Sequence, residues 1–322
     1  MSMKPPILNA ATLVVICAGL LPAADSGLLN LVMPDARILA GVNVDLAKTT
    51  PFGVYVLSQI QTQAPQHLQQ VTALTGFDPT QDLHELLFAS NGTPAHKSGL
   101  VLARGNFDAA KIQAAGLAGG GTTINYKGVM LLLDPKQTHG VAFLDPTLAV
   151  AGDVASVEGA IDRQTAPATL SAALVGQVNQ WSLSEDAWFI ANVPLSSLKP
   201  PANPSTPQNA AVQNAFQNIQ QAAGGVKFGS QVAFTGQAQA DTPQNATAIA
   251  GVVQFLASMA QLQAQQKNPQ LAAILPSLSA TTNANLVNLS LSVPEAQAEQ
   301  AFKMQPHSAA PQSIHRAPRR RQ

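Results

Sequence analysis

The chain has 322 residues and carries 17 basic and 17 acidic side chains, so its formal net charge is zero. Charged residues make up 11% of the chain, against about 25% in average domains, while the apolar fraction of 46% is ordinary. The lack of a basic excess argues against specific nucleic-acid binding. The scattered 22 Gly and 23 Pro exclude collagen-like and long coiled-coil architectures. The length suits one large or two small domains with a sizeable core.

Residues 1–26 have the pattern of a secretory signal peptide. Lys4 supplies the positive charge, an apolar run covers residues 7–21, and small residues follow a proline. The apolar run is shorter than the about 20 residues that a helix needs to cross a bilayer. We therefore expect an exported protein, periplasmic or extracellular, that is cleaved after Ala23 or Ser26. A permanent N-terminal membrane anchor is the alternative.

Cys17, the single cysteine of the chain, lies inside this apolar run. Ile16 before it is bulky where a lipoprotein signal has a small residue, so Cys17 is interpreted as a hydrophobic residue of the signal peptide. The mature chain would then have no cysteine, and it could form neither a disulfide nor a thiolate nucleophile.

The first half of the mature chain predicts an α+β module. Apolar residues alternate over 36–48, which predicts a strand, and Pro51 and Pro65 are placed to begin two helices. Strands are then expected at 82–90, 98–106, 123–135, 139–145 and 147–152, with helices at 107–121 and 153–164. Neighbouring strands joined by short turns predict an antiparallel sheet, with helices packed mainly on one face.

A weaker version of this order follows in the second half. The segment 186–198 parallels 37–48, and the elements expected after it are a helix at 209–225, strands at 227–240, helices at 243–278, a strand at 285–293 and a last helix at 294–303. A repeat of about 150 residues indicates domain duplication, since solenoid repeats are about 20 to 50 residues long. The predicted organisation is a signal peptide (1–26), two related modules (27–180 and 181–303) and a disordered basic tail (304–322).

This order of elements resembles a type of secreted bacterial protein with a duplicated α+β module and no assigned activity. The segments that carry the resemblance are NVDLAK, GFDPTQDLHELLFA, LVLARGNFDAAKI and AVAGDVASVEGAID, at 43–48, 76–89, 100–112 and 149–162. The likeness covers residues 35–165 well and the second half loosely. It implies a fold and export, and it brings no catalytic residue with it.

Most residues that suggest chemistry have a structural interpretation. The histidines (His67, His84, His96, His139, His307 and His315) show none of the close spacings of a zinc site. Asp78, which precedes Pro79, is interpreted as a turn or N-cap residue. Asp108 and Asp153 each precede an expected helix and are predicted to cap it. The glycines of 117–123 lack the lysine of a phosphate-binding loop and are interpreted as a linker. We expect no metal and no cofactor.

One cluster stands out for its composition. Trp181 and Trp188 flank Glu185 and Asp186. Paired carboxylates beside aromatic rings can bind or cleave a sugar. Two tryptophans at the start of a strand are more often part of the core or of a domain junction. These four residues are therefore only weak candidates for a ligand or interaction site.

The C-terminal tail differs from the rest of the chain. Its arginines, Arg316, Arg319, Arg320 and Arg321, lie among Pro, Ser and Gln, a composition typical of disorder. Each charge adds about 1 kcal/mol near an anionic surface, which gives a weak, salt-sensitive contact. A solvated tail without a partner is the alternative.

Two functions follow from these observations. The first is an exported non-catalytic protein that binds another protein or an apolar ligand in the cell envelope or outside the cell. The reason for this hypothesis is that the sequence predicts a complete fold but shows no recognisable nucleophile, set of metal ligands or cofactor-binding loop. The alternative is an envelope hydrolase whose site is assembled from distant residues, with Glu185, Asp186 and one histidine as candidates.

Overall fold

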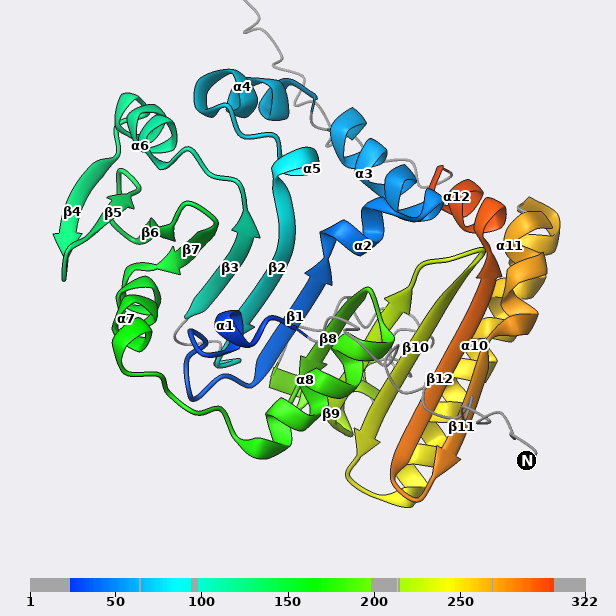
Figure 1. Cartoon of the computed structure of the whole chain (residues 1–322). Coiled ribbons are helices and arrows are strands. Elements are labelled where there is room, and N and C mark those ends of the chain that lie inside the picture. Colours follow the sequence, from blue (N-terminus) through cyan, green and yellow to red (C-terminus); the bar gives the residue numbers. More distant parts are fainter. Residues whose placement is uncertain are drawn as a thin grey trace, which may run out of the picture.

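The computed structural model describes residues 24–63, 65–93, 98–197, 213, 215–267 and 269–303. Its centre is one antiparallel sheet of 12 strands in the order β11-β12-β10-β9-β8-β1-β2-β3-β7-β6-β5-β4 (Figure 1). The chain is therefore an α+β protein, as the sequence predicts. Because β1 pairs with β8 at the middle of the sheet, the two halves of the chain share one continuous sheet.

The strands are β1 (Ile38–Asn43), β2 (Leu83–Ser90), β3 (Gly99–Gly105), β4 (Thr122–Tyr126), β5 (Val129–Leu133), β6 (His139–Asp145), β7 (Leu148–Asp153), β8 (Ala187–Ala191), β9 (Ile219–Lys227), β10 (Gln231–Ala240), β11 (Ser279–Asn283) and β12 (Leu286–Pro294). The α-helices are α1 (Ser26–Leu29), α2 (Val44–Lys48), α3 (Pro51–Gln63), α4 (Pro65–Thr75), α5 (Pro79–Asp82), α6 (Ala109–Ala118), α7 (Val154–Thr165), α8 (Ala172–Ser184), α10 (Pro243–Lys267), α11 (Pro269–Ile274) and α12 (Glu295–Lys303). Short 3-10 helices cover Leu195–Ser197 and Leu275–Ser277.

The predicted caps at Asp108 and Asp153 are confirmed, and Asp78, interpreted as a turn or a cap, is a cap. Each of the three aspartates precedes its helix and accepts a hydrogen bond from a backbone N–H of the first turn, which satisfies a donor that has no partner within the helix. The pairs are Asp78 with Thr80 at 2.9 Å, Asp108 with Lys111 at 3.0 Å, and Asp153 with Ser156 at 3.0 Å. Gly76 ends α4 with a φ of 72°, in the left-handed region that glycine adopts without strain.

Two predicted segments take a different conformation, and α5, α8 and β11 lie where no such element was predicted. Residues 44–48 form α2 instead of continuing the strand, because the Asn43 side chain accepts from the Leu46 N–H at 2.9 Å and starts a helix. The expected helix at 209–225 does not extend to its predicted end, since residues 219–225 belong to β9. This strand is paired with β8 on one side and β10 on the other, and pairing on both edges overrides the helical preference of a Gln/Ala sequence.

One face of the sheet, here called face A, carries the main core. Leu39, Leu100 and Ile190 point to this face and are fully buried. They pack with the apolar side of α1, α7 and α8, which contribute residues such as Val157 and Val178. In Figure 1, α1 and α8 lie in front of the sheet on this side.

The opposite face, face B, has a different pattern. Because side chains alternate along a strand, residues directly opposite one another across neighbouring strands share a face. One such row crosses all strands and is here called the cross-strand row: Thr123, Leu132, Val141, Ala151, Val101, Phe88, Ala40, Phe189, Gly224, Gly236, Leu289 and Ala280.

Long α10 covers the β10–β12 end of face B. Its Ala246, Ile249 and Ala250 are buried against Ala238 and Val287 of the sheet. By length and composition alone, residues Pro243–Gln265 of α10 would also be able to cross a membrane, although one such helix is weak evidence for a membrane span.

Candidate functional site, an apolar pocket beside α6

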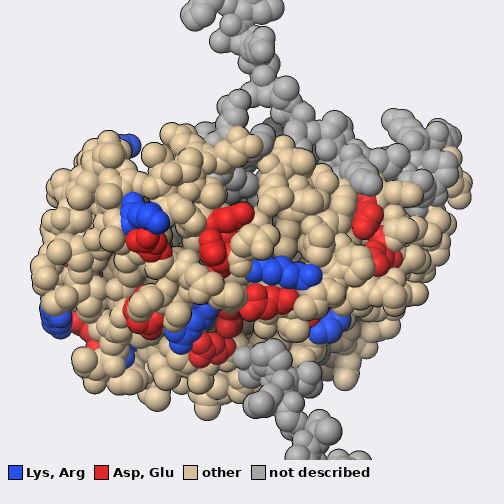
Figure 2. Space-filling model, turned by 45° about the horizontal axis from the view of Figure 1, so that its top comes forward, with Lys and Arg blue, Asp and Glu red and all other residues tan. Residues whose placement is uncertain are grey.

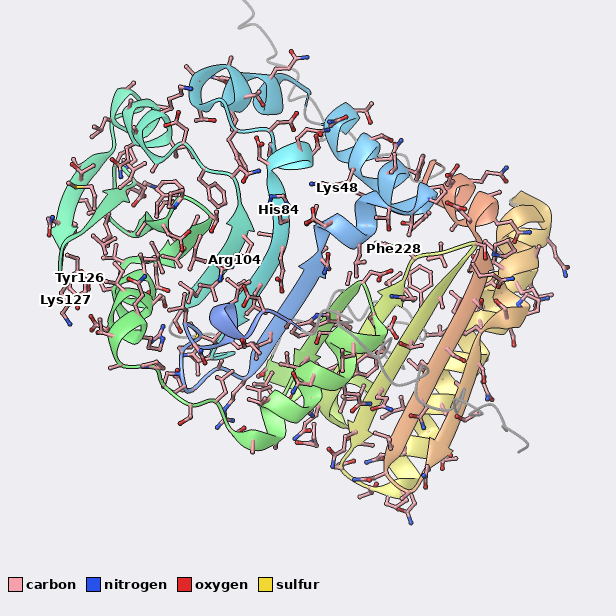
Figure 3. The ribbon with its side chains drawn as sticks, viewed as in Figure 1. Lys48, His84, Arg104, Tyr126, Lys127 and Phe228 are labelled. Carbon is pink, nitrogen blue, oxygen red and sulfur yellow. The ribbon has the colours of Figure 1, made fainter. Side chains whose placement is uncertain are left out.

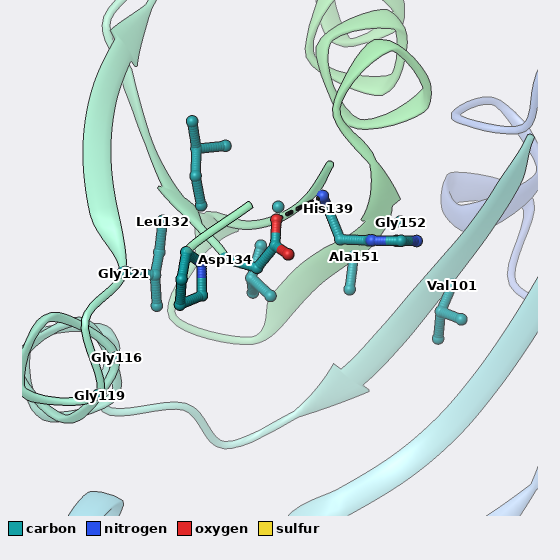
Figure 4. Close-up of a pocket in the computed structure, with 13 residues that line it drawn as sticks. Val101, Gly116, Gly119, Gly121, Leu132, Asp134, His139, Ala151 and Gly152 are labelled. Carbon is teal, nitrogen blue, oxygen red and sulfur yellow. Dashed lines mark hydrogen bonds between the residues drawn. The ribbon is translucent and has the colours of Figure 1, made fainter. Parts of the chain in front are cut away.

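A pocket of about 450 Å³ lies on face B at the β3–β5 end of the sheet (Figure 4). Its floor is formed by part of the cross-strand row, namely Val101, Ala151, Val141 and Leu132. The remaining lining residues are Gly116, Gly119, Gly121, Leu133, Asp134, Pro135, His139, Gly140 and Gly152. Small-molecule pockets are typically about 300–1,000 Å³ and mostly apolar, so this pocket has the size and lining of a ligand site.

Glycines at the end of α6 form one side of the pocket. A Cβ added to Gly116 would lie 2.3 Å from Leu132 Cδ2, so the helix approaches the sheet closely at this point. Gly121 lies close to the backbone of β5, since its added Cβ would be 2.7 Å from the Leu133 carbonyl oxygen. The run at 117–123 does lead from a helix to a strand, as the linker interpretation requires. Gly119 and Gly121 of this run also line the pocket, which the sequence did not predict.

The polar side chains that line the pocket, Asp134 and His139, lie next to each other. Figure 4 shows Asp134 and His139 beside each other, with Leu132 and the α6 glycines on one side and Val101 on the other. The Asp134 carboxylate accepts from the backbone N–H of His139 at 2.8 Å and of Thr138 at 2.7 Å. These bonds, the first above all, lower the pKa of Asp134, so the carboxylate is ionised at neutral pH.

The apolar floor continues beyond the pocket. Phe88 is paired with Val101, and Phe189 follows two strands further along the cross-strand row. Phe88 is 39% exposed, Val101 37% and Phe189 46%. From β5 to β8 the row crosses six strand spacings of about 4.8 Å each, or about 29 Å. Large apolar side chains that remain exposed together mark a surface for binding.

Neither a protein-family model nor a curated protein sequence matches the chain. Solved structures of a protein named TP0453 are similar to it. Crystal form III has a TM-score of 0.50 at 9% identity, covering 85% of this chain and 96% of that one. Form I has a TM-score of 0.49 at 8% identity, covering 85% and 95%. At such low identity the likeness to form III concerns the fold alone.

The structure brings the four weak candidates together inside the protein. Trp181 and Trp188 are each 6% exposed and belong to the face A core. Asp186 is 3% exposed and binds Lys227 Nζ at 2.6 Å and the Phe228 N–H at 2.7 Å. This arrangement fixes the turn from α8 into β8 against β9.

Glu185 is also buried, with 7% of its surface exposed. Its Oε1 accepts from the Thr235 hydroxyl at 2.6 Å, while its Oε2 is buried without a hydrogen-bond partner. Burial raises the pKa of Glu185, and the Thr235 bond and the positive Lys227 partly oppose this. Both carboxylates are thus enclosed among the described residues, and neither lines the pocket beside α6.

Of the histidines, His84 and His139 have described side chains. His84 Nδ1 lies 2.9 Å from Asp45 Oδ2, and its Nε2 lies 3.3 Å from Asn106 Nδ2. In Figure 3, His84 lies near Lys48 and Arg104. Both ring nitrogens thus have polar neighbours, an arrangement that positions the ring.

The surface carries few charged side chains, as expected from a chain in which 11% of the residues are charged. Figure 2 shows Lys and Arg close to Asp and Glu in small mixed groups, on a face that is largely uncharged. The four arginines of the tail lie outside the described residues. The pocket could not be predicted from the sequence, because it depends on which strands are neighbours in the sheet. The one signal in the sequence was the glycine run after an expected helix, where a close approach of backbone is possible.

Proposed function

We propose that this chain is an exported, non-catalytic protein that binds an apolar ligand, a molecule with a long hydrocarbon chain, in the pocket beside α6. The observation that carries the proposal is the apolar floor of the pocket, formed by Val101, Ala151, Val141 and Leu132. Burying such a ligand against this floor would be favourable by about 25 cal/mol per Å² of apolar surface removed from water.

The charge beside the pocket favours a ligand whose head group is uncharged or cationic. The ionised Asp134 carboxylate lies at the pocket and would repel an anionic group, whereas a hydroxyl could donate a hydrogen bond to it. The continuation of the row through Phe88 to Phe189 supports a ligand longer than the pocket itself, since these exposed rings would be covered by an extended chain.

Binding is testable with an uncharged fluorescent hydrocarbon probe. We would titrate delipidated protein with diphenylhexatriene and displace the probe with hexadecanol. The Val101→Trp variant places a large ring over the pocket floor, and we expect its affinity for the probe to fall at least about tenfold, the loss of 1.4 kcal/mol or more. Ala151→Phe fills the neighbouring position of the row and should have the same effect.

Val54→Trp is the matched control, because Val54 is 51% exposed on α3 and does not line the pocket. It adds the same ring to another exposed apolar position. Thermal unfolding followed by circular dichroism would establish that the variants are folded. Equal probe binding by Val101→Trp, Ala151→Phe and Val54→Trp would overturn the proposal.

A further inference from the structure

A second pocket, of about 770 Å³, lies at the opposite end of α6 from the apolar pocket. It is lined by the loop between α4 and α5, the loop from β3 into α6, and the turn between β6 and β7. The two pockets share no lining residue, so they are separate. A ligand of the second pocket would therefore differ from the apolar ligand proposed above.

Three aromatic rings line one part of this second pocket, namely Phe77, Phe107 and Phe143. The Phe77 and Phe107 rings are stacked with their centroids 5.3 Å apart, and the Phe107 and Phe143 centroids are 5.6 Å apart. Each of the three side chains remains partly exposed. The face of an aromatic ring carries partial negative charge and attracts a cation that is in contact with it.

The second pocket is also acidic. Asp82, Asp108 and Asp145 line it, and none of the described residues that line it is a lysine or an arginine. Asp108 is balanced, since it caps α6 and binds Lys111 Nζ at 3.0 Å. The negative charge of the pocket therefore comes mainly from Asp82 and Asp145.

Asp145 retains its charge at neutral pH. Its Oδ1 accepts from the Thr147 N–H and from the Thr147 hydroxyl, both at 2.7 Å. Burial raises the pKa of Asp145, but these bonds and the positive Arg104 outweigh it, so the pKa lies below its ordinary value. Arg104 balances this charge only in part, because its Nη1 is 3.9 Å from Asp145 while its Nε binds Asp25 at 2.7 Å.

We propose that the second pocket binds a small organic cation with a methylated ammonium group. Such a group needs negative charge and aromatic contact, and has few or no N–H donors of its own. The pocket matches this need, because each of its three carboxylates already accepts a hydrogen bond from the protein and so supplies charge more than free acceptors. A phosphocholine lipid would bring a phosphate close to the same carboxylates, which favours a free cation.

Choline and its uncharged analogue 3,3-dimethyl-1-butanol form a matched pair of probes, since they have nearly the same shape. We would titrate the folded protein with each by isothermal titration calorimetry, and we expect only choline to bind. Equal binding of the two probes, or no binding of choline at millimolar concentration, would overturn the proposal. Phosphatidylcholine vesicles should not sediment the protein; binding to vesicles without binding of choline would overturn the assignment to a free cation.

Three variants test the residues that carry the proposal. Asp82→Asn and Asp145→Asn remove the charge and keep an oxygen that can accept the existing hydrogen bond, while Phe107→Leu removes the central ring. We expect each to raise the Kd for choline by about fivefold or more. Asp241→Asn is the matched control, because Asp241 is exposed and does not line the pocket. Equal affinity of the two pocket asparagine variants and this control would overturn the proposal.

A last comparison separates this site from the proposed function. Val101→Trp fills the apolar pocket beside α6 and should leave the Kd for choline unchanged, whereas Asp145→Asn should leave binding of diphenylhexatriene unchanged. Loss of choline binding in a folded Val101→Trp variant would show that the second pocket is not an independent site. Circular dichroism during thermal unfolding would establish that each variant is folded.

Discussion

Trp188 and Phe189 are neighbours in the chain and lie on opposite faces of the same strand. Trp188 is 6% exposed and Phe189 46%. Trp188 lies on face A, where α8 packs on β8, and its ring lies over Gly41 of β1, since a Cβ built on Gly41 would come within 2.5 Å of the ring. Phe189 lies on face B, between the parts of that face that α6 and α10 contact.

The contrast shows that burial here is decided by which helices pack on a face. Alternation along β8 sends one ring to each side, but it does not determine which side is covered. From β8 to β5 the sheet therefore has a closed core on face A and an apolar surface with a pocket on face B. In this part of the sheet we expect face A substitutions to alter stability and face B substitutions to alter binding.

The largest loss of stability is expected for Trp188→Ala. Removing this ring would leave a cavity at the junction between β1 and β8, where the two halves of the sheet meet. Deletion of a buried aromatic ring costs about 3–5 kcal/mol. We expect the free energy of unfolding, measured in urea, to fall by that amount. A loss below about 1 kcal/mol would show that the ring does not support the junction.

A smaller change in stability is expected for Phe189→Ala, because about half of this side chain is already in water. We expect a loss below about 1.5 kcal/mol, in line with partial burial of an aromatic side chain. Probe binding should weaken more clearly, by several-fold, if the ligand extends along the cross-strand row. Unchanged diphenylhexatriene affinity would confine the ligand to the pocket beside α6.

The smallest effect concerns the pH dependence of stability. Burial raises the pKa of Glu185 above its ordinary 4.5, so the folded state binds more protons than the unfolded state in the window above pH 4.5. The free energy of unfolding contributed by this group therefore falls as the pH rises through that window. We expect Glu185→Gln to flatten this slope in urea titrations from about pH 4.5 to about pH 7.5.

Asp134→Asn is the control for this measurement. Backbone N–H groups lower the pKa of Asp134 below its ordinary 3.8, so its contribution to stability is present above that pH and is lost only as the pH falls further. The substitution should leave the slope above pH 4.5 unchanged. An equal slope in Glu185→Gln and the natural chain would contradict the role assigned to Glu185.

Local signals were sufficient for much of the secondary structure. The prolines at 51 and 65 begin α3 and α4, and Asp108 and Asp153 cap α6 and α7, as predicted. These features depend on groups within a few residues of each other. The segment at 219–227 could not be predicted in this way, because its strand conformation depends on hydrogen bonds to β8 and β10, which are distant in sequence.

By itself, the sequence determined the α+β class, the antiparallel pairing of neighbouring strands and the helix caps, because these follow from periodicity and from hydrogen bonds between nearby residues. Duplication of the halves stays a prediction. Only the tertiary structure decided that both halves form one sheet, that the Trp181–Trp188 cluster is buried and that face B has an apolar pocket. The physical reason is that each depends on which distant strands are paired and which face a helix covers.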